Sequence, residues 1–180
     1  QLMNGLRAHM IISDSPFNVR VKGHVGGNGA IQHEEFKFAS GEMSPTEFIQ
    51  FLTQAFRLQS QFSVDNSVHY QFCDWRHLEE FMTAGNSAYQ QLINLIVWVK
   101  NVGAMGSFYR SRHELILAYV NGKGPRRNNV QLGKYGRNRT NVWEYAGVNT
   151  LKRNRMAELA MHPTVKPCAL VQDAIDLLID

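Results

Sequence analysis

The sequence predicts an α/β fold, a sheet with helices on both of its faces. Short apolar runs alternate along the chain with stretches in which apolar residues recur at helical spacing. With 180 residues, 44% of them hydrophobic and 19% charged, the chain suits one compact domain with a sizeable core. Ligand sites in such sheets lie at the carboxyl ends of the strands, so residues that follow a predicted strand are the first candidates for function.

The first strand and the first helix have clear sequence signals. The apolar run His9–Ile12 stops at a turn that contains Asp14 and Pro16, which indicates a buried strand followed by a loop. Ser44 is typical of a helix N-cap, with Pro45 at the first helical position and Glu47 completing a capping box. The apolar residues of this helix then recur at helical spacing: Phe48, Phe51, Leu52, Ala55 and Phe56.

Five further elements are predicted after this helix. Val68–Cys73 indicates a strand, Trp75–Ala84 a helix, and Leu92–Lys100 and His113–Val120 two more strands. No periodic pattern follows until His162. The tail, Thr164–Asp180, is then predicted to be helical, with one apolar face made of Leu170, Ala174, Ile175, Leu177 and Leu178.

The net charge of +4 hides a strong asymmetry along the chain. The segment from Asn121 to Lys166 holds ten basic and two acidic residues, so it carries +8 and the rest of the chain carries −4. A basic block on an otherwise acidic body indicates a polyanion as partner. The alternative is a merely solvated loop, but glycine, asparagine and tyrosine are interleaved with the arginines.

Other patterns argue against a membrane protein and against a metal site. The longest apolar stretch, around Leu92–Val99, is too short to span a bilayer. The N-terminal residues do not resemble a signal peptide, so a cytoplasmic location is expected by default. Cys73 and Cys168 are far apart and show no zinc-type spacing, which favours two reduced thiols and no metal.

The residues Asp14-Ser15-Pro16-Phe17 carry groups suited to binding a flat, amino-bearing base. The carboxylate of Asp14 accepts a hydrogen bond from an amino group, and the turn aims a backbone carbonyl at the same group. The ring of Phe17 stacks on the base. Taken alone, the same residues also fit a plain turn at a strand end.

This motif resembles the Asp-Pro-Pro-Tyr signature of the amino-group DNA methyltransferases, and a glycine-rich loop follows it here as in that family. His162-Pro163-Thr164-Val165-Lys166-Pro167 resembles the family's His-Pro-Thr-x-Lys-Pro element, which in the β-type motif order precedes the cofactor-binding half. The segments that resemble the family's middle part are Val97–Asn101, Tyr109–Leu117 and Asn141–Trp143. The resemblance covers essentially the whole chain.

The resemblance implies a Rossmann-like S-adenosylmethionine-dependent methyltransferase sheet and a mechanism for it. The target adenine flips out of the duplex and stacks on Phe17. The Asp14 side chain and the Ser15 carbonyl, in the turn that Pro16 completes, bind the N6 amino group for direct displacement. The residues implied to contact the cofactor, S-adenosylmethionine, are Asp14, His162, Thr164 and Lys166.

The basic segment falls where this family places its target-recognition region. The chain is therefore expected to divide into a catalytic α/β region (1–121), a recognition segment (122–161) and the start of the cofactor-binding half (162–180). Duplex DNA is the expected partner, and many members of the family form homodimers. The residues expected to contact DNA are Arg126, Arg127, Asn128, Asn129, Lys134, Arg137 and Arg139.

Two departures from the family pattern keep alternatives open. The family's Pro-Pro is Ser15-Pro16 here, and the Phe-x-Gly-x-Gly cofactor loop is not reached before Asp180, so the sheet is expected to be incomplete at its C-terminal end. A non-catalytic DNA-binding remnant is one alternative. A cytosine-N4 enzyme is another: Asp at position 14 usually goes with adenine, but serines flank it. An RNA or protein methyltransferase is a third.

Overall fold

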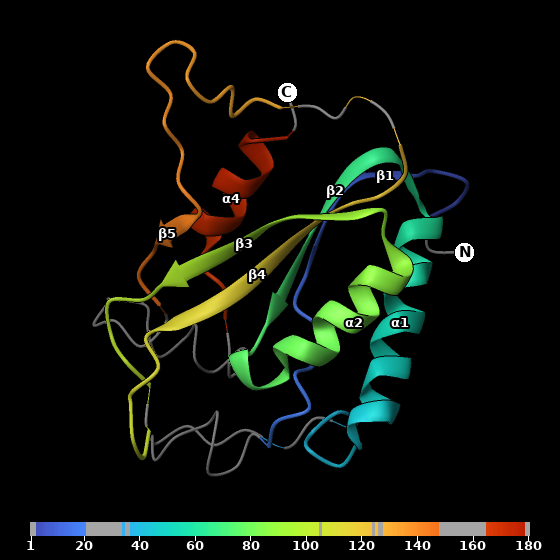
Figure 1. Cartoon of the computed structure of the whole chain (residues 1–180), viewed down its shortest axis with the longest axis vertical. Coiled ribbons are helices and arrows are strands. Elements are labelled where there is room, and N and C mark those ends of the chain that lie inside the picture. The colour runs from blue at the N-terminus through green and yellow to red at the C-terminus, as the bar shows by residue number, and fades with distance from the viewer. Residues whose placement is uncertain are drawn as a thin grey trace.

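The computed structural model describes residues 3–20, 34, 37–104, 106–123, 125, 128–147 and 165–178. Its centre is a five-stranded sheet in the order β1-β2-β4-β3-β5 (Figure 1). The strands are β1 (Ala8–Ser13), β2 (Ser63–Cys73), β3 (Gln91–Val99), β4 (His113–Val120) and β5 (Val142–Glu144). The helices are α1 (Pro45–Gln61), the 3-10 turn η2 (Trp75–His77), α2 (Leu78–Ala88) and α4 (Cys168–Asp176).

The direction of the strands brings several loops to one edge of the sheet. β1 is parallel to β2, β5 is parallel to β3, and β4 is antiparallel to both β2 and β3. The segments that follow β1, β2 and β3 therefore meet the start of β4 at one edge, which we call the carboxyl edge. The register places Leu115 opposite Cys73 and Glu114 opposite Trp98.

Helices cover both faces of the sheet, as the sequence predicts. On one face, Phe48 and Phe56 of α1 and Phe81 of α2 are fully buried against the sheet. On the other face, Leu170 and Ala174 of α4 pack in a second core that contains Trp98 and Phe72. Each of the buried leucine and phenylalanine side chains contributes roughly 1.5–3 kcal/mol to folding. The two cores fix the sheet, and with it the position of the carboxyl edge.

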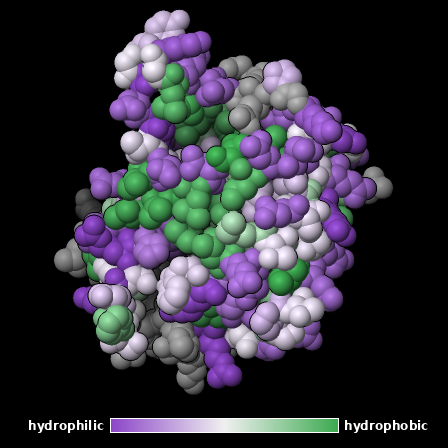
Figure 2. All heavy atoms as spheres, in the orientation of Figure 1, coloured by the Kyte–Doolittle hydropathy of each residue, from purple (hydrophilic) through white to green (hydrophobic). Residues whose placement is uncertain are grey.

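Helices α1 and α2 do not cover the first face of the sheet completely. Figure 2 shows apolar atoms gathered in the middle of this face, over β3. Leu92, Leu95 and Val97 of β3 pack against the first core and remain partly exposed. In the part of the chain that the structure describes, no helix is long and apolar enough to cross a membrane.

The predicted helix starts and strands agree with the structure in several places. The capping box is present: Glu47 N donates to Ser44 Oγ at 3.4 Å, and Ser44 N donates to Glu47 Oε2 at 2.8 Å. β4 has the predicted bounds. β2 begins earlier than predicted, at Ser63, and the helix predicted from Trp75 begins as a 3-10 turn before α2.

Two predictions at the C-terminal side were wrong. β5 was not predicted as a strand, because three residues are too short for a periodic pattern. The tail helix was predicted from Thr164, which lies outside the described residues, but Val165 and Lys166 are not helical and the helix begins at Cys168. Pro167 explains the later start, since the residue before a proline is disfavoured in the α conformation.

Candidate active site at the carboxyl edge

The Asp14–Phe17 turn lies where the sequence predicts it, directly after β1 at the carboxyl edge. Ser13 is the last residue of β1 and pairs in register with Gln71 of β2. The side chain of Asp14 keeps 29% of its surface accessible. Phe17 is half-buried, and its ring meets the ring of Phe81 edge to face, with 6.1 Å between centroids. The turn thus presents a carboxylate while its aromatic ring is anchored on α2.

A buried lysine contacts the Asp14 carboxylate. Lys166 Nζ lies 2.9 Å from Asp14 Oδ2 and 3.1 Å from Glu114 Oε2, and only 10% of its side chain is exposed. Lys100 Nζ forms an ion pair with the other oxygen of Glu114. Four charges of alternating sign therefore lie in a row: Asp14, Lys166, Glu114 and Lys100. They come from the ends of β1 and β3, the start of β4 and the segment before α4.

The buried charges stabilise one another. Burial by itself raises the pKa of the Glu114 carboxyl, but Lys166 and Lys100 outweigh it and hold this pKa below its ordinary value. Burial lowers the pKa of the Lys166 ammonium, but Glu114 and Asp14 outweigh it and hold this pKa above its ordinary value. Both groups are therefore charged at neutral pH, and Lys166 presents a fixed positive charge to Asp14.

Two aromatic rings also lie close to Lys166. Its Nζ lies 5.5 Å from the centroid of the Phe17 ring and 5.1 Å from that of Phe72. A cation over an aromatic face gains electrostatic energy, more so where water is excluded. Lys166 is thus held by two carboxylates and two rings, so it links the Asp14–Phe17 turn to the second core.

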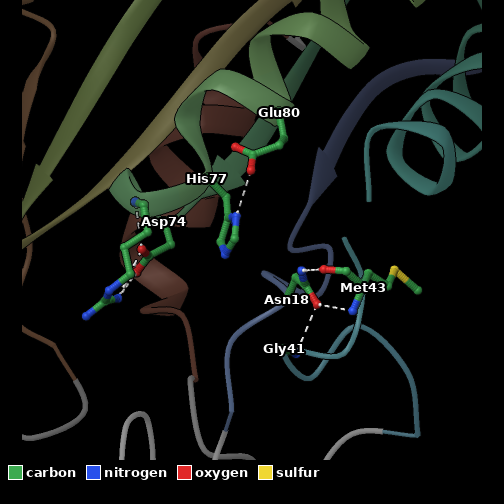
Figure 3. A network of polar contacts seen from close by, with 7 residues as sticks. Asn18, Gly41, Met43, Asp74, His77 and Glu80 are labelled. Atoms are coloured by element: carbon green, nitrogen blue, oxygen red, sulfur yellow. Dashed lines mark hydrogen bonds and ion pairs between the residues drawn. The ribbon is translucent and has the colours of Figure 1, made fainter. Parts of the chain in front are cut away.

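Asn18 fixes the far end of the same turn. Its backbone adopts a left-handed conformation (φ 54°) and the residue is buried. Its Nδ2 donates to Met43 O at 2.9 Å, and its Oδ1 accepts from Gly41 N at 2.9 Å and from Met43 N at 3.3 Å. Figure 3 shows this side chain reaching across to the loop that precedes α1. Asn18 therefore ties the end of the motif to the N-terminus of α1.

The described part of the predicted DNA-contacting segment packs against α4. Asn129 N donates to Leu177 O at 3.1 Å, and Arg137 Nη1 donates to Asn129 O at 2.8 Å. Arg139 forms an ion pair with Asp173 of α4 and lies 4.9 Å from the Trp143 ring centroid, so its side chain supports the fold of this segment. Asn128 and Lys134 are exposed. Four predicted site residues lie outside the described residues: Arg126, Arg127, His162 and Thr164.

Sequence reasoning missed Lys100, Glu114 and Phe72 as neighbours of the motif. Their contacts arise because β4 lies antiparallel between β2 and β3, and no local sequence pattern predicts this strand order. The only local signal was the position of Lys100 and Glu114 at strand ends.

An exposed aromatic pair on the same edge was also missed. Phe108 and Tyr109 are 86% and 80% exposed, and their rings meet edge to face with centroids 4.5 Å apart. They lie on the connection from β3 to β4, where Arg110 donates to Gly103 O and Ala104 O and so holds the loop folded. The signal in the sequence was two adjacent aromatics in a polar stretch, 100–112, that contains arginines and no acidic residue.

Comparisons with known proteins identify a family and a fold for this chain. A family model described as DNA methylase matches residues 8–180. The structure is similar to the crystal structure of the M1.HpyAVI–SAM complex, with a TM-score of 0.58, 16% identity, and coverage of 99% of this chain and 70% of that one. A second M1.HpyAVI structure has a TM-score of 0.57 and 15% identity, with coverage of 97% and 66%.

The PvuII DNA methyltransferase, described as cytosine-N4-specific, has a TM-score of 0.65 and 9% identity, with coverage of 99% of this chain and 67% of that one. No curated protein sequence matches. At these identities the three solved structures establish the fold alone, a Rossmann-like methyltransferase sheet. This chain spans 66–70% of their lengths.

Proposed function

Because this chain belongs to the DNA methylase family, whose model matches residues 8–180, we propose that it methylates the N6 amino group of adenine in duplex DNA. The methyl donor is S-adenosylmethionine, and the target base flips out of the duplex before direct displacement. The observation that carries the proposal is the Asp14 carboxylate at the carboxyl edge, partly accessible and held on one oxygen by buried Lys166.

Each residue of the turn has a distinct role in this proposal. Asp14 accepts a hydrogen bond from the amino group of the base, and the carbonyl of Ser15 accepts a second one. Phe17, half-buried and anchored on Phe81, is the ring on which the base stacks. Pro16 restricts the backbone of Ser15, so the two acceptors are aimed before the base arrives. Most of the rate enhancement then comes from positioning.

The residues at the edge fit the methyl donor chemically. S-adenosylmethionine supplies a methyl group on a positively charged sulfur, and its amino-acid part carries an ammonium and a carboxylate, which suit the Asp14 carboxylate and the Lys166 ammonium respectively. Asp14 and Lys166 are the described residues that would contact it, together with His162 and Thr164 from the sequence motif. Lys166 at the same time keeps the Asp14 side chain in one orientation.

The DNA contacts are proposed for the basic segment 122–161, with 1–121 as the catalytic region and 162–180 as the start of the cofactor-binding half. Lys134 and Arg137 suit phosphate contacts, as do Arg126 and Arg127, while Asn128 and Asn129 suit base edges. Arg139 acts by positioning this segment through Asp173. The exposed pair Phe108 and Tyr109 adds an aromatic surface at the carboxyl edge on which bases stack.

Cytosine N4 is the second candidate target. Ser13 and Ser15 flank Asp14, and one similar solved structure is described as cytosine-N4-specific. Both exocyclic amino groups offer the same hydrogen-bond donors to Asp14 and Ser15, so the same turn serves either base. Asp at position 14 favours adenine by the family resemblance.

Mass spectrometry of nucleosides from duplex DNA, incubated with this chain and S-adenosylmethionine, tests the proposal. We expect N6-methyladenine. Detection of N4-methylcytosine instead would show that cytosine is the target base. Methylation of RNA but not of DNA, in a parallel incubation with RNA, would show that RNA is the substrate. If no methyl transfer occurs while DNA binding is retained, the same assay on a chain lengthened to include a Phe-x-Gly-x-Gly cofactor loop decides, and absence of transfer there as well would favour the non-catalytic remnant. Sedimentation velocity on the same sample tests the predicted homodimer.

A further inference from the structure

A chain of hydrogen bonds runs from the Asp14–Phe17 turn into the first core. Ser15 Oγ lies 3.3 Å from Ser13 Oγ, and Gln59 Nε2 of α1 donates to Ser13 Oγ at 3.2 Å. The two serines are half-buried, and Gln59 lies beside them on the helix that covers this face. The turn is therefore bonded to a helix that is remote from it in the sequence.

The core fixes the orientation of the Gln59 amide. Its Oε1 accepts from Gln71 Nε2 at 2.5 Å and from Tyr89 OH at 2.9 Å, and Gln71 Nε2 also donates to Tyr89 OH at 3.0 Å. Gln71 and Tyr89 are buried. With Oε1 occupied by two donors, Nε2 is directed toward Ser13. Gln71 is also the register partner of Ser13 on β2, so the side chains of these two residues lie on the same face of the sheet.

The Ser13 hydroxyl links the helix to the turn. Ser13 Oγ accepts from the Gln59 amide, and because a hydroxyl oxygen has two acceptor sites and one proton, either serine can donate the bond between Ser13 and Ser15. Serine hydroxyls near a turn commonly bond to neighbouring backbone and so allow several local conformations. When the Ser15 hydroxyl bonds to Ser13 and not to the neighbouring backbone, one of these local conformations is favoured over the others.

Ser15 is the position at which this restraint matters most. It precedes Pro16, which restricts its ψ, but nothing in its own covalent structure restricts its φ. We propose that the Gln59–Ser13–Ser15 hydrogen-bond chain holds the Ser15 backbone in the orientation that methyl transfer requires. Ser13 and Gln59 are then positioning residues. The kinetic part of this inference rests on the proposed function, whereas the restraint itself does not.

Ser13 is the residue to change, because its replacement leaves the hydrogen bonds among Gln59, Gln71 and Tyr89 intact. Ser13→Ala is expected to lower kcat by about three- to tenfold with KM and DNA affinity unchanged, since one hydrogen bond is lost. Ser13→Thr retains the hydroxyl and suits a strand, so it is expected to keep kcat near wild type. Equal losses in the two variants, or a loss confined to KM, would overturn the inference.

A proline at position 15 supplies the same restraint covalently. In the Ser15→Pro background, Ser13→Ala is expected to change kcat by less than about twofold, because the ring fixes φ without the hydroxyl. A loss equal to that in the Ser15 background would show that Ser13 acts by another route. A Ser15→Pro enzyme without turnover would also contradict the inference, because a rigid turn would then not suffice.

Hydrogen exchange followed by mass spectrometry separates the restraint from the catalysis. In the absence of substrate, Ser13→Ala is expected to speed amide exchange in peptides that cover 13–18 by about three- to tenfold, with α4 peptides unchanged. Unchanged exchange at 13–18 would overturn the inference. If the wild-type chain shows this protection but transfers no methyl group, the proposed function fails and the restraint stands.

Discussion

Lys166 Nζ lies 2.9 Å from Asp14 Oδ2, so a residue just before the tail helix holds one oxygen of the carboxylate that follows the first strand. The two residues are at opposite ends of the chain. Lys166 also forms an ion pair with Glu114, and Glu114 forms a second one with Lys100. The arrangement explains how a carboxylate on a short turn acquires one fixed orientation.

The Asp14→Ala variant tests the role of this carboxylate. We expect methyl transfer to fall by at least about a hundredfold, because a preorganised hydrogen-bond acceptor for the amino group is lost. DNA binding, measured by fluorescence anisotropy, is expected to remain nearly unchanged. Asp74→Ala is the matched control, since Asp74 follows the neighbouring strand β2 and pairs with Arg76. Retained turnover in Asp14→Ala would refute the assignment.

The Lys166→Met variant tests the electrostatic part of the arrangement. Removing the ammonium leaves buried Glu114 with Lys100 alone and the partly accessible Asp14 without its cation, and we expect a loss of about 2–4 kcal/mol in the free energy of unfolding. The double variant Lys166→Met/Glu114→Gln is expected to recover part of this loss, because the buried charge is removed as well. Urea denaturation measures both. A double variant less stable than Lys166→Met would contradict the coupling.

The Asn18 contacts lead to a third prediction. Asn18→Ala removes three hydrogen bonds and places an alanine at a positive φ, so we expect a loss of about 2–4 kcal/mol in stability. Asn18→Gly also loses the bonds but adopts this φ freely, and is expected to be about 1 kcal/mol more stable than Asn18→Ala. Thermal denaturation compares the three chains. Equal stabilities of the alanine and glycine variants would mean that the backbone strain is absent.

The sequence predicted those parts of the molecule that depend on local chemistry. The capping box at Ser44 predicted the start of α1, and the apolar run from His113 predicted β4 with its bounds. The turn after β1 was predicted because a strand end followed by Asp14 and Pro16 is a local pattern. β5 was not predicted, since its three residues are a strand only by pairing with β3.

The site was predicted less completely for the same reason. Asp14 and Lys166 were each identified from a motif, but their contact and the participation of Glu114 and Lys100 depend on how β4 lies between β2 and β3. The Gln59–Ser13–Ser15 chain likewise depends on the crossing of α1 over β1. Tertiary placement of this kind leaves no periodic signal in one sequence.

Buried His69 leads to a prediction for the pH dependence of stability. Burial lowers the pKa of His69 from its ordinary value of 6.5 to about 4. The unfolded chain therefore binds a proton as pH falls through 6.5, whereas the folded chain binds it only near pH 4. We expect stability to fall by about 3 kcal/mol over this window because of His69. His69→Gln is expected to flatten the dependence in urea denaturation at stepped pH, and an unchanged slope would assign it to other groups.

The basic segment leads to a prediction about DNA binding and salt. Arg126→Gln/Arg127→Gln is expected to weaken binding to duplex DNA about equally for all sequences, because phosphate contacts carry no base information. Each lost phosphate contact lowers the dependence of log K on log salt by about 0.9, so the double variant is expected to reduce the slope by about 1.8. Arg57→Gln, an exposed arginine on α1, is the control and is expected to leave the slope unchanged. If the double variant keeps the full slope, this part of the segment does not contact the DNA backbone, and the phosphate contacts are assigned to Lys134 and Arg137 instead.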